Sequence, residues 1–217
     1  MAGRRGADLA RAAAAVARGD RVMAGLMKRT GPFRLPRSAR SHFAALAESI
    51  HYQQLAGAAA EAIHRRFVAL FDGDPLPEAV LAIHPRTLRA AGLSRSKVAS
   101  IRDLAAKVVD GTVPLRAIAR RSDEDIITRL SVVKGIGRWT AEMFLIFQLR
   151  RLDVWPVGDY GVRQGYALAY GLRKLPTPQR LMIEGERFRP YRTVAAWYCW
   201  QAVHEHRNLR WRRRPPR

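Results

Sequence analysis

A glycine-containing turn and a carboxylate that follows it are the residues of this chain best suited to chemistry. The turn, residues 133–137 (Val-Lys-Gly-Ile-Gly), opens an amphipathic helix near Arg138, and Asp159 stands where the next helix is expected to begin. Alternate glycines let a phosphate approach the backbone amides, and amides at a helix N-terminus favour an anion. This combination indicates an enzyme that acts on nucleic acid. The alternatives are an ordinary helix–helix turn and a simple helix cap.

Charge and cysteine content narrow the function classes. The chain has 39 Lys and Arg against 18 Asp and Glu, a net charge of +21, which favours a polyanionic partner. A solvated basic surface is the alternative. With Cys199 as its single cysteine, the chain cannot form within itself a disulfide framework, a four-cysteine iron–sulfur cluster or a cysteine zinc site. We find neither a membrane-length apolar span nor a secretory signal, so a cytoplasmic location is expected.

The spacing of apolar residues and the turn signals predict an all-α fold of about ten helices joined by short loops. One apolar stripe, for example, comprises Phe43, Leu46, Ala47 and Ile50, behind a cap at Ser38 or Ser41. Later helices are expected at residues 160–170 and from Tyr191 to about His206. We divide the chain into a central subdomain at 38–152, a second subdomain at 8–37 plus 153–207, and a basic tail at 208–217, predicted to be disordered.

Several short motifs occur in an order that one protein family shares. They are Gln53-Gln54-Leu55, residues 92–97 (GLSRSK), residues 135–141 (GIGRWTA), residues 156–159 and residues 189–192 (RPYR). Together they resemble the helix-hairpin-helix DNA glycosylase superfamily, which has a Gly/Pro-rich loop and a catalytic aspartate. Residues 135–141 are similar to the DNA-3-methyladenine glycosylase II branch. The resemblance extends over residues 40–206, most of the chain.

The resemblance implies two helical subdomains with a substrate cleft between them. It implies a monomeric, monofunctional enzyme of base excision repair that flips alkylated purines such as 3-methyladenine and 7-methylguanine out of double-stranded DNA. Hydrolysis of the glycosidic bond would leave an abasic site. Two alternatives stay open: the same fold acting on uracil, oxidised guanine or a mispaired base, and a non-catalytic DNA-binding protein with this hairpin. Asp159 separates the last from the others, because a pure binder needs no acid at that position.

The resemblance also assigns roles to single residues. Asp159 would stabilise the positive charge that develops on the sugar as the bond breaks. Bifunctional members of the superfamily carry a nucleophilic lysine at the second position after the GxG, where this chain has Trp139, which cannot form a Schiff base. Leu55 would fill the space left by the flipped base, with ordinary core packing as its alternative.

Aromatic side chains are expected to receive the flipped base, and their electron-rich rings would attract a positively charged alkylpurine. The candidates are Trp139, Tyr191, Tyr160 and Tyr52, with core packing as the alternative for each. Family members hold tryptophan at the position of Tyr191. Trp197 and Trp200 lie at helical spacing and are expected in the core.

The remaining expectations concern DNA and ions. The residues expected to contact DNA are Gln53, Gln54, Arg95, Lys97, Lys134, Gly135, Ile136, Gly137, Arg138, Thr140 and Arg163. By resemblance, the backbone carbonyls of Ser131, Val133 and Ile136 would hold a monovalent cation. No other cofactor is expected.

Overall fold

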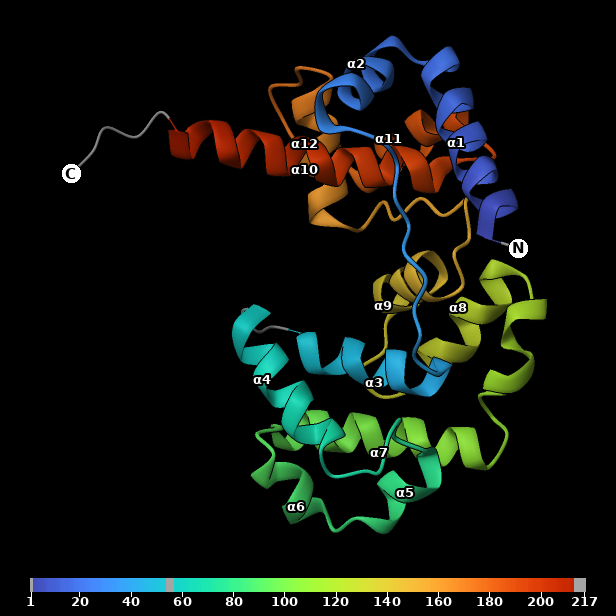
Figure 1. Cartoon of the computed structure of the whole chain (residues 1–217), viewed down its shortest axis with the longest axis vertical. Helices are drawn as coiled ribbons and strands as arrows, with labels where there is room; N and C mark the ends of the chain where they lie inside the picture. The colour runs from blue at the N-terminus through green and yellow to red at the C-terminus, as the bar shows by residue number, and fades with distance from the viewer. Residues whose placement is uncertain (1, 54–56, 213–217) are drawn as a thin grey trace. The chain divides into compact units, whose positions relative to one another are not determined.

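The computed structural model describes residues 2–53 and 57–212, and every regular element within these ranges is a helix (Figure 1). The predicted all-α fold is therefore confirmed. No helix in these ranges is both long and apolar enough to cross a membrane. The chain forms two compact units, which we call the central unit (Arg37–Leu149) and the terminal unit (Met1–Pro36 with Arg150–Arg217). The sequence prediction placed the corresponding boundaries at residues 38 and 152.

The central unit is a helical bundle in which α3 packs against both α4 and α7. Its elements are α3 (His42–Tyr52), α4 (Gly57–Val68), α5 (Pro77–Ala82), α6 (Pro85–Ala90), α7 (Arg95–Val109), η1 (Leu115–Arg120), α8 (Asp123–Ser131), α9 (Arg138–Met143) and the π-helical η2 (Phe144–Gln148).

Serine caps start the principal helices of this unit. The hydroxyl oxygens of Ser41, Ser94 and Ser122 each accept a hydrogen bond from the amide three residues later, at 3.2–3.3 Å. Such caps satisfy amides that have no partner inside the helix. The predicted cap at Ser41 is confirmed, and so is the apolar stripe of α3, because Phe43, Leu46, Ala47 and Ile50 are all buried.

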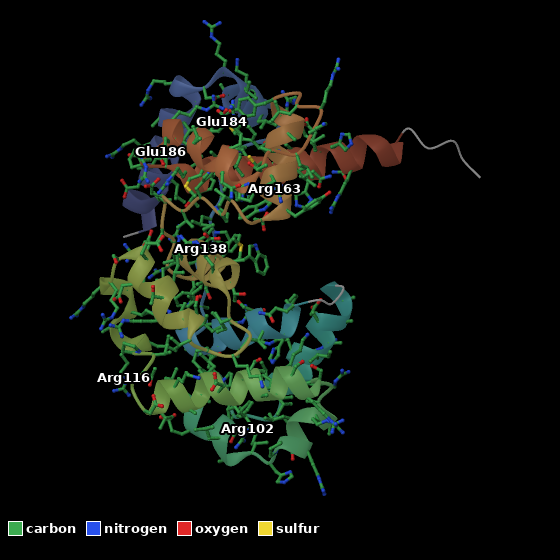
Figure 2. The ribbon with its side chains drawn as sticks, turned by 180° about the vertical axis from the view of Figure 1, so that it is seen from behind. Arg102, Arg116, Arg138, Arg163, Glu184 and Glu186 are labelled. Atoms are coloured by element: carbon green, nitrogen blue, oxygen red, sulfur yellow. The ribbon has the colours of Figure 1, made fainter. Side chains whose placement is uncertain are left out.

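A single guanidinium joins α5 to α7. Arg102, labelled in Figure 2, donates from Nη1 to the carbonyl oxygens of Val80, Leu81 and Ile83 at 3.0–3.3 Å. A cation at these carbonyls complements the negative end of the α5 dipole. The contact holds the short helix against the long one.

The terminal unit combines both ends of the chain. Its elements are α1 (Ala2–Gly19), α2 (Arg21–Thr30), α10 (Tyr160–Ala169), α11 (Pro178–Gly185), η3 (Glu186–Phe188) and α12 (Arg192–Arg212). Helix α2 is missing from the sequence prediction, and the carboxylate of Asp20 starts it by accepting from the amide of Met23 at 2.9 Å.

The C-terminal tail needs a second correction. Helix α12 continues through Arg212, so residues 208–212 of the predicted disordered tail are helical. Residues 213–217 lie outside the described part of the chain. Residues 208–212 (NLRWR) contain leucine and arginine, which have high helix propensity, and they extend the helix where the pattern of charges suggested a solvated tail.

A buried pair of histidines lies between α3 and α4. His51 is fully buried, and its Nδ1 lies 2.9 Å from Nδ1 of His64 in a hydrogen bond. Burial, together with the charges of His64 and Lys97, lowers the pKa of His51 to about 3. The folded protein therefore holds this imidazole neutral, whereas in the unfolded chain it takes up a proton near its ordinary pKa of 6.5.

This difference makes stability depend on pH. Between pH 6.5 and about 3 the unfolded state binds more protons at His51, so the free energy of unfolding falls as the pH falls. The contribution is up to about 1.4 kcal/mol per pH unit. Urea unfolding from pH 7 to pH 4 would measure it. In His51→Gln, which keeps a polar side chain that does not titrate, the dependence should be shallower, and equal slopes for the two proteins would contradict the prediction.

Candidate active site

The hairpin between α8 and α9 is shaped by its backbone. Gly135 has a φ of +81°, a conformation that side chains disfavour, and a Cβ atom there would lie 2.6 Å from Oγ of Ser100. Val133 and Ile136 are buried, and the amide of Ile136 donates to the carbonyl of Val133 at 3.0 Å. The two apolar side chains thus anchor the turn, while Gly135 allows it to pass close to α7.

The first turn of α9 carries no side-chain cap. Gly137 is its N-cap residue and has no side chain that could accept from the following amides. Amides at an uncapped helix start are suited to hold an anion such as a phosphate oxygen. The predicted contact of residues 135–137 with DNA stays a prediction.

Two side chains of the central unit position this turn. Nε2 of Gln53 donates to the carbonyl of Gly135 at 2.9 Å and lies 3.4 Å from Oγ1 of Thr140, which is buried. On the other side, Asp103 accepts from the amide of Lys134 at 2.7 Å. Gln53, predicted to contact DNA, and Thr140 therefore connect the end of α3 to the hairpin. Gln54 and the predicted wedge Leu55 lie outside the described residues.

Arg138 forms ion pairs within its own unit. Its guanidinium, labelled in Figure 2, binds both carboxylate oxygens of Glu124, at 2.6 and 3.0 Å, and one oxygen of Glu142 at 3.2 Å. The Glu124 carboxylate and the nearby charge of Glu142 raise the pKa of Arg138 above its ordinary value. The side chain predicted to contact phosphate thus joins α8 to α9.

Two other predicted phosphate contacts also have internal partners. Nζ of Lys97 donates to the carbonyl of His51 at 2.6 Å, and partial burial lowers its pKa. In the terminal unit, Nε of Arg163 donates to the carbonyl of Pro176 at 2.9 Å. Lys97 thus binds the C-terminal turn of α3, and Arg163 binds the segment just before α11. Arg95 and Lys134 have exposed side chains, as a DNA contact requires.

Asp159 lies at the start of α10 and is 9% exposed. Its Oδ1 accepts from the amide of Val162 at 2.7 Å, the hydrogen bond expected of a helix cap. The same oxygen accepts from Nε1 of Trp200 at 2.9 Å. Asp159 is therefore both the helix cap and a nearly buried carboxylate with two donors on one oxygen.

The loop that leads to Asp159 is held at several points. Oγ1 of Thr193 accepts from the amide of Val154 at 3.0 Å and donates to the carbonyl of Arg151 at 2.8 Å. Nε1 of Trp155 donates to the carbonyl of Leu181 at 2.7 Å. These contacts attach the loop to α12 and α11, so the acid stands on an ordered segment.

Trp200 is a residue of the site that the sequence interpretation missed. It was expected in the core but is only half-buried, and its indole N–H reaches Asp159. A Cβ atom on Gly161 would lie 2.9 Å from Cδ1 of Trp200, so Gly161 leaves room for the ring. A glycine directly after the Asp-Tyr pair was the available signal. Trp197, in contrast, packs its ring against Phe33 and Tyr198.

The four predicted pocket aromatics divide between the units. The terminal unit holds Tyr160, 60% exposed and next to Asp159 in the chain, and the half-buried Tyr191. The central unit holds Trp139, 46% exposed on α9, and Tyr52, 39% exposed. Rings with this much exposed surface can still gain contact area by stacking on a ligand.

Tyr52 has different surroundings from those expected of a base pocket. It lines a cavity of about 400 Å³ whose other walls are largely charged. The charged lining residues are Arg40, Glu48, Glu61, Arg65 and Asp74. A base stacks better between aromatic or apolar walls, so this surrounding does not support the predicted role of Tyr52.

The two hairpin glycines differ in a way that can be tested. Gly135→Ala would force a side chain into a positive φ and against Ser100, so it should lower the free energy of unfolding by about 1–3 kcal/mol. Gly137→Ala is the matched control, because Gly137 has a φ of −98° and a Cβ atom on it would meet nothing within 4 Å. Urea unfolding should show a clearly smaller loss for Gly137→Ala. Equal losses would mean that the turn does not depend on the conformation of Gly135.

Comparison with known proteins identifies the family of the chain. A family model described as "HhH-GPD superfamily base excision DNA repair protein" matches residues 47–190. DNA-3-methyladenine glycosylase 1 of Schizosaccharomyces pombe is 38% identical over 181 residues, which are 81% of this chain and 79% of that protein.

Two solved structures resemble the chain with similar sequence identity. A 3-methyladenine DNA glycosylase of Schizosaccharomyces pombe in complex with abasic DNA has a TM-score of 0.80 and 36% identity, over 88% of this chain and 95% of that one. A DNA-3-methyladenine glycosidase of Bacillus halodurans has a TM-score of 0.80 and 35% identity, over 89% of each chain. The resemblance seen in the sequence motifs is confirmed. The chain belongs to the HhH-GPD superfamily of base excision DNA repair proteins.

Proposed function

We propose that the protein is a monofunctional DNA glycosylase that releases alkylated purines, 3-methyladenine and 7-methylguanine among them, from double-stranded DNA. One observation carries the proposal: a nearly buried carboxylate, Asp159, is fixed by two donors at the start of α10. The relatives named above, which bear the name of 3-methyladenine glycosylases, support the substrate class. Such an enzyme would act in the cytoplasm, on the DNA of the nucleoid.

The chemistry follows from charge. As the glycosidic bond breaks, the sugar gains oxocarbenium-like positive charge, and a fixed carboxylate stabilises that charge far better in a site from which water is excluded than in bulk water. Asp159 needs no reorganisation for this, because Val162 and Trp200 already hold it. It can also orient or deprotonate the attacking water.

The leaving group supplies the selectivity. Purines alkylated at N3 or N7 carry positive charge, which weakens the glycosidic bond and attracts the base to the face of an electron-rich ring. The rings of Tyr160 and Trp139 are exposed, as such stacking requires. An unmodified purine is neutral, so it gains less from the ring and departs less readily.

The hairpin would hold the DNA backbone. The amides at the start of α9 have no side-chain cap, and the exposed amine of Lys134 lies in the same turn. These groups suit phosphate oxygens. The large positive net charge of the chain adds attraction that does not depend on base sequence.

A monovalent cation at the hairpin is part of the proposal. The carbonyls of Ser131, Val133 and Ile136 would hold it, and neutral oxygen donors suit a cation of low charge. The carbonyl of Val133 accepts one hydrogen bond, from Ile136, which leaves it a second lone pair for the ion. The bound charge would add to the attraction of the turn for phosphate.

Replacement of the acid tests the reaction. Asp159→Asn keeps the size of the side chain and removes its charge, so release of methylated bases should fall at least about 100-fold. Asp110→Asn is the control, because Asp110 is a solvent-exposed carboxylate in the central unit, and it should act like the wild type. Chromatography of the bases released from methylated DNA measures the rate. Equal release by Asp159→Asn and the wild type, or none by the wild type, would overturn the proposal.

The absence of a nucleophilic amine at position 139 gives a separate prediction. Trp139 cannot attack the sugar, so water is the nucleophile and abasic DNA should stay uncut until alkali is added. Gel electrophoresis before and after alkali reads the result, and borohydride should trap no covalent complex. Lys134→Ala is the matched control, because Lys134 carries the exposed amine in the hairpin. Trapping by the wild type that Lys134→Ala abolishes would reveal a lyase and contradict the prediction.

A further inference from the structure

We propose that Trp200 is a positioning residue for the reaction, acting through Asp159; the inference rests on the proposed glycosylase function. Its indole N–H donates to Oδ1 of Asp159 at 2.9 Å, although Trp200 lies on α12, 41 positions further along the chain. The helix cap alone needs only the amide of Val162, which donates to the same oxygen at 2.7 Å. The indole is a second donor that capping does not require.

The chemistry of the indole suits it to hold an acid without competing for its proton. An indole N–H donates a hydrogen bond but cannot accept one, and it remains neutral at any physiological pH. Two donors from fixed directions determine the rotation of the carboxylate, and a hydrogen bond to a charged acceptor is worth more than one between neutral groups. Trp200 therefore sets the orientation that Asp159 presents to the sugar.

The neighbouring backbone is shaped around this bond. A Cβ atom on Gly161 would lie 3.1 Å from Nε1 of Trp200 and 3.1 Å from Oδ1 of Asp159, the two atoms that the bond joins. One turn later, a Cβ atom on Gly165 would overlap the carbonyl oxygen of Cys199, at 1.8 Å. Both glycines lie on the face of α10 that meets α12. They give the indole the space to reach the acid.

The residue next to Trp200 in the chain adds no charge beside the bond. Cys199, next to Trp200, is fully buried, and burial raises the pKa of its thiol, with a further contribution from the charge of Asp159. The thiol therefore stays protonated and neutral. No second charge from this neighbour offsets the effect of the two donors on the carboxylate.

A variant that removes only the donor tests the inference. Trp200→Phe keeps a large ring and loses the N–H, and Trp197→Phe removes an indole from the same helix as the matched control. We expect Trp200→Phe to lower the single-turnover rate of base release about tenfold to a hundredfold. The dissociation constant for DNA with an abasic-site analogue should stay within about twofold, and Trp197→Phe should keep the wild-type rate.

A double-mutant cycle distinguishes positioning from general support of the fold. If Trp200 acts through the carboxylate, Trp200→Phe should change the residual rate of Asp159→Asn by less than about twofold, whereas independent effects would multiply. Gly161→Ala should reproduce the loss with both side chains present, because the new methyl group displaces the indole.

The outcomes separate this inference from the proposed function. Absence of base release by the wild type would overturn the function itself. Normal release by the wild type and by Trp200→Phe would leave the function standing and overturn the role of Trp200. A rate loss matched by a proportional loss of DNA affinity, or multiplied in the Asp159→Asn background, would likewise assign Trp200 to the fold alone.

Discussion

The close contact of α10 with α12 is the constraint on which the position of Asp159 depends. Gly165 brings the two helices so near that a methyl group on it would overlap the carbonyl of Cys199. At this separation Trp200, one residue further along α12, reaches the first residue before α10, which is Asp159. A wider spacing would break this bond and leave the capping bond from Val162 in place. The packing of α10 against α12 therefore determines the geometry of the Asp159 carboxylate.

The hairpin relies on backbone, with side chains in support. The charged residues around it are largely engaged with each other: Arg138 with two glutamates, Asp103 with Lys107 and the amide of Lys134. Gln53 binds the carbonyl of Gly135. These contacts fix the turn before any ligand arrives, so little conformational entropy remains to be lost on binding. In the proposed function, rigid amides would hold a phosphate without regard to base sequence.

The sequence predicted much of this protein because its signals were local. Helical spacing, serine caps and glycines in turns act within a few residues, and they led to the all-α class, the cap at Ser41 and the hairpin. The order of the motifs led to the family. Helix α2 was missed because a single residue, the cap Asp20, separates it from α1. What the sequence could not predict was the partner of each charge. Arg138, Lys97 and Arg163 are basic residues of the kind that contact phosphate. Only the fold shows that they have internal acceptors, at 2.6–3.2 Å. The bond from Trp200 to Asp159 spans 41 positions, and no periodicity connects residues at that separation.

Asp159 and the absence of a lysine at position 139 together determine how the proposed reaction would be catalysed. In the proposed reaction, Trp139 stands at the position of a nucleophilic lysine, so water would attack a sugar that is already positively charged. The barrier of the proposed reaction would then depend on how well Asp159 stabilises that charge, which varies with the distance and direction of the carboxylate. Val162 and Trp200 both donate to Oδ1 of Asp159 and so fix the carboxylate. Gly161 and Gly165 leave the space that Trp200 needs.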